Sequence, residues 1–180
     1  MTDAHARPTG PVRSRRLRAA LGSLLFLFVA PGVVAGLVPW LLTGWDAADD
    51  VPVALVVAGA ALLAAGVAVL LHAFARFVIE GLGTPAPVAP TERLVVGGLY
   101  RYVRNPMYLA VAAVIVGQAL LLGRPALLLY ALAFGAVVWA FVRLYEEPTL
   151  ARRFGAEYEA YRRAVPGWWP RRRPWSPPGG

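Results

Sequence analysis

Residues 53–79 read VALVVAGAALLAAGVAVLLHAFARFVI, an apolar run in which His72 and Arg76 appear only near the end. A helix needs roughly 20 apolar residues to cross a bilayer core about 30 Å thick. The run therefore predicts a transmembrane helix. Gly59 and Gly66 argue weakly against a span, but transmembrane helices tolerate such residues where neighbouring helices satisfy the backbone.

Three other stretches of the 180-residue chain are similarly apolar, at residues 21–42, 107–122 and 126–145. The chain is 58% hydrophobic and has a mean hydropathy of +0.57, well above the values of soluble domains. Only Gly123, Arg124 and Pro125 separate the last two stretches, which favours a tight turn. We predict an all-α integral membrane protein with about four transmembrane helices, the last two forming a helical hairpin.

The charges are distributed unevenly along the chain. All 18 basic residues are arginines, and most of them flank the apolar stretches on one predicted side, whereas residues 45–50 carry three acids and no base. The positive-inside rule then places both termini in the cytoplasm, and we expect a bacterial plasma membrane as the location. A net charge of +8 beside a membrane indicates lipid head groups as partners, not nucleic acid.

The chain has no cysteine, and its two histidines are far apart in the sequence. Thiolate catalysis is therefore excluded, and no metal site is expected. The arginines before the first apolar stretch are also typical of a secretory or twin-arginine signal, but the stretch is long for a signal peptide. An uncleaved membrane anchor is the favoured interpretation.

Four regions follow from this pattern. Residues 1–20 form an Arg-rich N-terminus that we expect to be disordered, and residues 21–79 hold the first two spans. Residues 80–170 contain the remaining spans and the candidate site, and residues 171–180 form a basic tail rich in proline and glycine. Apolar residues at helical spacing after the last span predict a cytoplasmic amphipathic helix. They are Leu150, Phe154, Tyr158, Tyr161 and Val165.

The start of the third span is the first candidate site. Asn105 followed by Pro106 is typical of a helix N-cap and of proline at the first helical position. The N-terminus of a helix attracts anions through its free N–H groups, and Arg101 and Arg104 add positive charge. The alternative is that Asn105 only caps the helix and the arginines only anchor it.

The end of the fourth span is the second candidate site, with Arg143, Glu146 and Glu147. Both ends of a helical hairpin return to the same membrane face, so residues 100–108 and 143–147 are expected to meet. Carboxylates at a membrane interface are costly unless they are hydrated, paired or bound to a ligand. A simple i, i+4 pair of Arg143 with Glu147 is the alternative.

A third group of polar residues, His72, Arg76 and Glu80, lies on one face of the second predicted span. An arginine at the bilayer centre is expensive, so the group belongs near the cytoplasmic end or beside a wet cavity. For His72, a packing role is the simpler interpretation.

Three motifs occur in order along the second half of the chain: GLYRYVRNPMYL at residues 98–109, EEPTL at 146–150 and FGAEYEAY at 154–161. Together they resemble the isoprenylcysteine carboxyl methyltransferase family, whose superfamily includes membrane phospholipid N-methyltransferases. The resemblance covers roughly residues 74–170. It implies S-adenosyl-L-methionine as the methyl donor, bound on the cytoplasmic side.

The resemblance also implies roles for individual residues. Arg104 and Arg143 are the candidate catalytic residues, with Arg143 facing the acceptor, and Glu146 and Glu147 hold the ribose or amino group of the donor. The glycines of residues 81–83 are similar to the Gly-x-Gly of phospholipid methyltransferases. The implied cofactor-binding residues are Gly81, Gly83, Leu94, Val95, Tyr100, Asn105, Pro106, Met107, Tyr108, Glu146 and Glu147.

The chain departs from the family at one position, because Arg104-Asn105-Pro106 stands where many members have Arg-His-Pro. Asparagine still caps a helix and donates a hydrogen bond, but it cannot carry a proton as imidazole does. Transfer of a methyl group from a sulfonium donor needs neither a metal nor a covalent intermediate, which agrees with the residues available.

The sequence therefore predicts an S-adenosylmethionine-dependent methyltransferase that acts on a lipid-like or hydrophobic acceptor, by carboxyl O-methylation or amine N-methylation. Two alternatives stay open at this point. One is an NADPH-dependent membrane reductase of the sterol reductase type, and the other is a non-enzymatic membrane assembly protein.

Overall fold

The computed structural model describes residues 29–80 and 93–176, which contain helices and loops and no strand. The predicted all-α class is confirmed for this part of the chain. The predicted disordered N-terminus, the start of the first span, Gly81 and Gly83 lie outside the described residues. The elements in chain order are a π-helical turn η1 (Val33–Leu37), α2 (Val38–Thr43), α3 (Val53–Glu80), a 3-10 turn η2 (Gly98–Arg101), α4 (Pro106–Leu122), α5 (Pro125–Phe141), a π-helical turn η3 (Val142–Glu146) and α6 (Glu147–Ala164).

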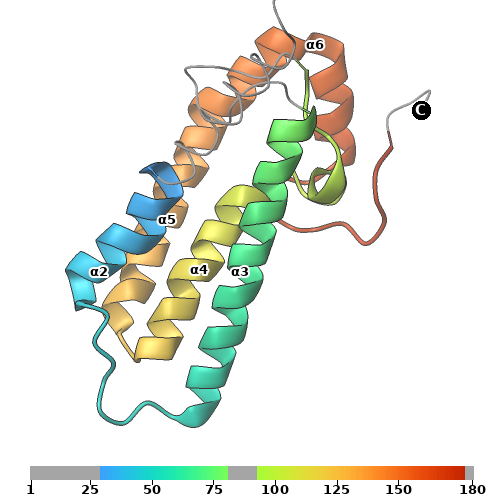
Figure 1. The fold of residues 1–180 in the computed structure, drawn as a ribbon. Coiled ribbons are helices and arrows are strands. Elements are labelled where there is room, and N and C mark those ends of the chain that lie inside the picture. The colour runs from blue at the N-terminus through green and yellow to red at the C-terminus, as the bar shows by residue number, and fades with distance from the viewer. Residues whose placement is uncertain (1–28, 81–92, 177–180) are drawn as a thin grey trace, which may run out of the picture.

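Helices α2 to α5 run up and down alongside one another, and α3 packs most closely on α4 (Figure 1). Glycine makes this approach possible, because a Cβ atom at Gly59 would lie 2.5 Å from the backbone nitrogen of Leu121. A Cβ atom at Gly117 would lie 2.7 Å from the nitrogen of Leu63. A Cβ atom at Gly66 would lie 2.9 Å from the carbonyl oxygen of Ala110. Gly59 and Gly66, which argued weakly against a span in the sequence, are thus contact points between two helices.

The outer surface of the helices is more apolar than a water-facing surface would be. Ile115 and Leu127 are fully buried, yet Leu129 and Leu132 are each 70% exposed. Within residues 29–80 and 93–176, two helices are long and apolar enough to cross a membrane, Val53–Arg76 and Pro125–Ala164, and two apolar helices are shorter, Val29–Thr43 and Pro106–Leu122. The count of four spans therefore stays a prediction.

Polar side chains tie the first helix to the others inside the apolar bundle. A π-helical turn displaces backbone carbonyls from the regular helical ladder, and η1 leaves two of them for side chains. Tyr130 donates its hydroxyl hydrogen to the carbonyl of Val34 at 2.8 Å, and Gln118 donates from Nε2 to the carbonyl of Ala35 at 2.7 Å. Each of these buried polar groups is satisfied, as a membrane interior demands.

Helix α6 changes direction at Gly155, whose backbone is not helical (φ 52°, ψ −125°). After this kink the second half of the helix turns back beside the loop that precedes α4 (Figure 1). Its apolar face is buried at Tyr158, Tyr161 and Val165, which pack against Leu94 and other residues of that loop. The predicted amphipathic helix is confirmed, and the kink directs its apolar face onto the candidate site.

Candidate functional site

Helix α4 begins at Pro106 with Asn105 as its N-cap, as the sequence predicts. The prediction that the Asn105 side chain forms a capping hydrogen bond is wrong, because that side chain makes no such bond to α4. The backbone of Asn105 (φ −116°, ψ 51°) is not in the extended region that capping residues adopt. Its N–H donates to the carbonyl of Gly167 at 3.3 Å. The side-chain nitrogen Nδ2 is buried and has no partner in the structure.

The expected meeting of the two ends of the α4–α5 pair is confirmed. Tyr108 donates its hydroxyl hydrogen to Glu146 Oε2 at 3.0 Å, and Arg104 Nη1 donates to Glu147 Oε1 at 2.8 Å. The π-helical turn η3 immediately precedes Glu147 and adds a residue to the helical turn. The two adjacent carboxylates thus have different partners, one in the loop before α4 and one in the first turn of α4.

Glu147 lies at the centre of an ion-pair network. It is 7% exposed, and its oxygens lie within 2.8 Å of Arg104, 3.1 Å of Arg143 and 3.6 Å of Arg162. Burial alone would raise the pKa of Glu147, but the hydrogen bond and charge of Arg104, with those of the other arginines, outweigh burial and hold the pKa below its usual value. The i, i+4 pair with Arg143, which was the alternative interpretation, is therefore present.

Arg104 is the centre of the contacts between the start of α4 and the end of α6. Besides Glu147, it donates from Nε to the carbonyl of Val165 at 2.9 Å and from Nη1 to the hydroxyl of Tyr158 at 3.0 Å. Its side chain is 13% exposed. These contacts tie the loop before α4 to α6 and to the segment that follows it. The catalytic role that the resemblance implies for Arg104 stays a prediction.

The C-terminal segment of residues 165–176 runs along the loop before α4 and pairs with its backbone. Arg171 N donates to the carbonyl of Tyr102 at 2.9 Å, and Trp175 N donates to the carbonyl of Arg101 at 3.0 Å. Arg101 Nε in turn donates to the carbonyl of Trp175 at 2.6 Å. Sequence reasoning missed this contact, because backbone pairing leaves no side-chain pattern and the aromatic, basic composition indicated only an interfacial anchor.

The remaining predicted cofactor-lining residues fall into two groups. Val95 and Tyr100 are buried together against Ala73 and the partly buried Met107, whereas Leu94 packs on the tyrosines of α6. Pro106 is fully buried.

His72 and Arg76, two residues of the polar group on α3, lie beside Gly98 in the loop before α4. A Cβ atom at Gly98 (φ +56°) would lie 2.8 Å from both His72 Nε2 and Arg76 Nε. The absence of a side chain at Gly98 therefore allows the loop before α4 to pack against α3. Within the described chain, no group of three or more potential ligands could hold a metal ion.

The chain matches a known protein family and a curated relative. Residues 54–157 match the family model described as phospholipid methyltransferase. The protein-S-isoprenylcysteine O-methyltransferase of Schizosaccharomyces pombe is 38% identical over 76 residues, which cover 41% of this chain and 31% of that protein. The match thus spans about a third of the curated relative, and no solved structure matches. Since the family model covers more than half of the residues and includes both ends of the site, the chain belongs to the phospholipid methyltransferase family of membrane methyltransferases.

Proposed function

We propose that this protein is an integral membrane methyltransferase that uses S-adenosylmethionine to methylate a lipid-like or hydrophobic acceptor at a carboxyl oxygen or an amine nitrogen. The observation that carries the proposal is the contact of Tyr108, in the first turn of α4, with Glu146 at the end of η3, beside the buried Asn105 at the N-cap of α4. These residues lie within the region that matches the methyltransferase family model.

The residues present fit this cofactor. Asn105 Nδ2 is a buried donor with no acceptor among residues 29–80 and 93–176, and such a group costs about 1–3 kcal/mol until something accepts its hydrogen bond. The carboxylate of the methionine part of the cofactor is such an acceptor. Glu146, which is half-buried and bonded to Tyr108, keeps acceptor capacity for an ammonium group or ribose hydroxyls.

When bound, the cofactor would supply an activated methyl group on a sulfonium sulfur. The protein's part is then to hold the reacting groups in line, and orientation of this kind supplies about 7–11 kcal/mol in favourable cases. Asn105 and Glu146 would fix the polar ends of the donor. Arg104 and Glu147 would hold the loop before α4 and helix α6 in place around the donor. A direct contact of Glu147 with the donor stays a prediction.

The proposed acceptor side faces lipid. Leu144 and Tyr145, which immediately precede Glu146, are 77% and 50% exposed, and the side chain of Arg143 is 57% exposed. An acceptor with a hydrocarbon chain would lie on this apolar surface with its polar end beside Arg143. The names of the matched family and of the yeast relative refer to a phospholipid and to an isoprenylated cysteine, and both carry long hydrocarbon chains.

Calorimetric titration of the purified protein with S-adenosylmethionine tests the proposal. We expect saturable binding, and incubation of membranes with a methyl-labelled donor should place the label in the lipid extract. Consumption of NADPH with an enone substrate in place of methyl transfer would favour the reductase alternative. Absence of binding to either cofactor would contradict an enzymatic role.

A further inference from the structure

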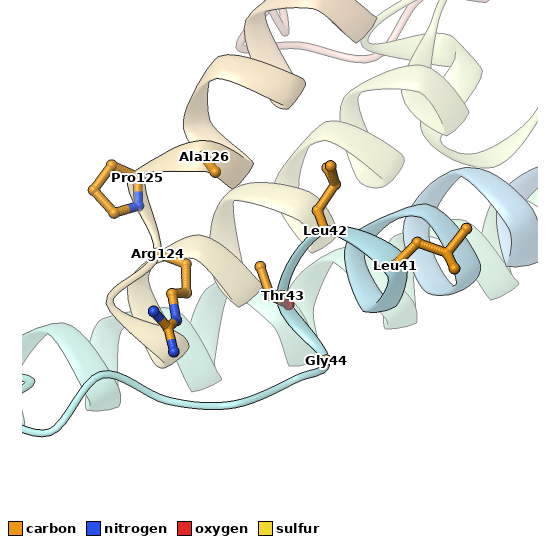
Figure 2. Close-up of a pocket in the computed structure, with 7 residues that line it drawn as sticks. All are labelled: Leu41, Leu42, Thr43, Gly44, Arg124, Pro125 and Ala126. Carbon is orange, nitrogen blue, oxygen red and sulfur yellow. The ribbon is translucent and has the colours of Figure 1, made fainter.

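A second site lies at the opposite end of the helices from the candidate methyl-transfer site. A pocket of about 380 Å³ lies between the end of α2 and the start of α5, beside the turn that joins α4 to α5 (Figure 2). The proposed function makes no use of it. The residues that line the pocket are Leu41, Leu42, Thr43, Gly44, Arg124, Pro125 and Ala126.

Arg124 provides the charge of this pocket. Its Nε donates to the backbone carbonyl of Asp46 at 2.9 Å, which fixes the plane of the guanidinium beside the turn. The two terminal nitrogens have no hydrogen bond or ion pair with any residue in ranges 29–80 and 93–176. A guanidinium that is held in place with two free donors is well suited to bind phosphate oxygens.

The pocket also has apolar lining residues, which are Leu41, Leu42, Pro125 and Ala126. Leu41 and Leu42 are 66% and 51% exposed, so this apolar lining continues onto the outer surface of the bundle. A free phosphate ion gains nothing from such walls. A phospholipid places its phosphate at the level of an interfacial arginine and its acyl chains along leucines of this kind.

The charge around the pocket selects the type of head group. Asp46, Asp49 and Asp50 lie in the loop that follows α2 and are exposed, and a Cβ atom at the pocket residue Gly44 would lie 3.0 Å from Asp46 Oδ2. A head group with net negative charge meets repulsion from these carboxylates. A zwitterionic head group instead pairs its phosphate with Arg124 and its ammonium with Asp46.

We propose that this pocket binds a zwitterionic phospholipid from the leaflet opposite the candidate active site, with its phosphate on Arg124. Phosphatidylcholine is the appropriate probe, because its nitrogen is already fully methylated and turnover cannot be mistaken for binding. The purified protein is reconstituted with phosphatidylcholine that carries a diazirine near its glycerol. Cross-linked peptides are then mapped by mass spectrometry.

We expect cross-links at residues 41–44 and 124–126 and a yield roughly tenfold lower in Arg124→Gln, because charge-assisted hydrogen bonds are lost. The matched control is Arg152→Gln, which removes an exposed arginine on α6 that donates a hydrogen bond to Thr149 and should leave the yield unchanged. Ala126→Trp fills the pocket and leaves Arg124 in place, so it should lower the yield as much even if Arg124→Gln disturbs the loop.

Three outcomes would overturn the proposal. They are equal labelling in wild type, Arg124→Gln and Ala126→Trp, equal labelling by a diacylglycerol that carries the same diazirine, and loss of labelling in the presence of millimolar inorganic phosphate. The last would make free phosphate the ligand. None of these outcomes bears on donor binding at Asn105 and Glu146, so the two proposals fail separately.

Discussion

At the scale of single residues, the two adjacent carboxylates of the site differ in their surroundings. Glu147 is surrounded by three arginines and is buried, whereas the protein contact of Glu146 is the hydroxyl of Tyr108. An acid already paired with cations has little capacity left for a ligand, and an acid bonded to a neutral hydroxyl has more. We therefore expect Glu146 to contact the proposed donor and Glu147 to stabilise the site.

Glu146→Gln should weaken S-adenosylmethionine binding about tenfold with an unchanged melting temperature, because one hydrogen bond to a charged group contributes about 1.5–3 kcal/mol. Glu147→Gln should lower the free energy of unfolding by about 3 kcal/mol, because it leaves the buried Arg104 without its carboxylate. Calorimetry and thermal unfolding of both variants in the same detergent provide the measurements. Unchanged stability of Glu147→Gln with lost donor binding would reverse the two roles.

Acidification should reveal the ion-pair network of Glu147. The arginines hold the pKa of Glu147 below its usual value, so its contribution to stability is complete above the unfolded-state pKa of about 4.3 and is lost as the pH falls through the lower folded-state value. Melting temperatures measured from neutral pH downward should therefore fall more steeply in wild type than in Glu147→Gln. Parallel curves would show that this carboxylate does not couple protonation to folding.

Replacing Asn105 with aspartate tests its contact with the donor, because the change adds a negative charge and leaves the shape of the side chain nearly the same. Because its side chain makes no capping bond, Asn105→Asp should keep the melting temperature while it places a negative charge where we expect the donor's carboxylate, and donor affinity should fall at least tenfold. Asn105→His, which restores the residue common in the family, should retain binding. If the aspartate variant binds the donor normally, the methyl donor lies elsewhere.

At the scale of helices, α3 and α4 are held at a distance that only glycine permits. The Cβ atom of an alanine at Gly59 would overlap the backbone of α4, and a helix backbone cannot move aside as a side chain can. At Gly135, in α5, nothing lies within 4 Å of the added atom. The two glycines have the same chemistry and opposite surroundings, which makes them a matched pair.

Gly59→Ala should lower stability by about 1–3 kcal/mol through overpacking. Gly135→Ala should be neutral or stabilise the protein by up to about 1 kcal/mol, because alanine favours helix. Chemical unfolding in detergent micelles gives both values. Equal effects at the two positions would mean that the close contact of α3 with α4 does not contribute to folding.

The sequence predicts more of the helices than of the site. Apolar length and the Asn105-Pro106 start give the bounds of α3 and α4 to within a residue, because those signals are local. Helix α5 ends at Phe141, before the predicted end at residue 145, because the π-helical turn η3 takes over at Val142. The pairing of residues 165–176 with residues 101–105 depends on backbone hydrogen bonds between distant segments. The residue types do not encode such bonds, so the partners of Arg104 and Asn105 follow only from the structure.

At the scale of the whole molecule, polar chemistry is divided between the two ends of the helices. One end has Glu146, Glu147 and the arginines of α6, and the other has Arg124 and three aspartates. The lateral surface between them exposes leucine and valine, with Val53 and Val137 at 76% and 69%. Such a distribution is stable only where the middle lies in hydrocarbon and both ends reach water.

The orientation of this arrangement in the membrane is the last prediction. Arginines concentrate at the end that holds the candidate methyl-transfer site, whereas the other end has Arg124 and three aspartates, so the positive-inside rule places the site and both termini in the cytoplasm. Because the chain has no cysteine, Ala47→Cys in the acidic loop and Ala156→Cys in α6, both exposed, provide single labels. An impermeant maleimide should label position 47 in intact cells and position 156 only after lysis. Labelling of position 156 in intact cells would invert the topology and place the site away from cytoplasmic S-adenosylmethionine, which would contradict the proposed donor as well.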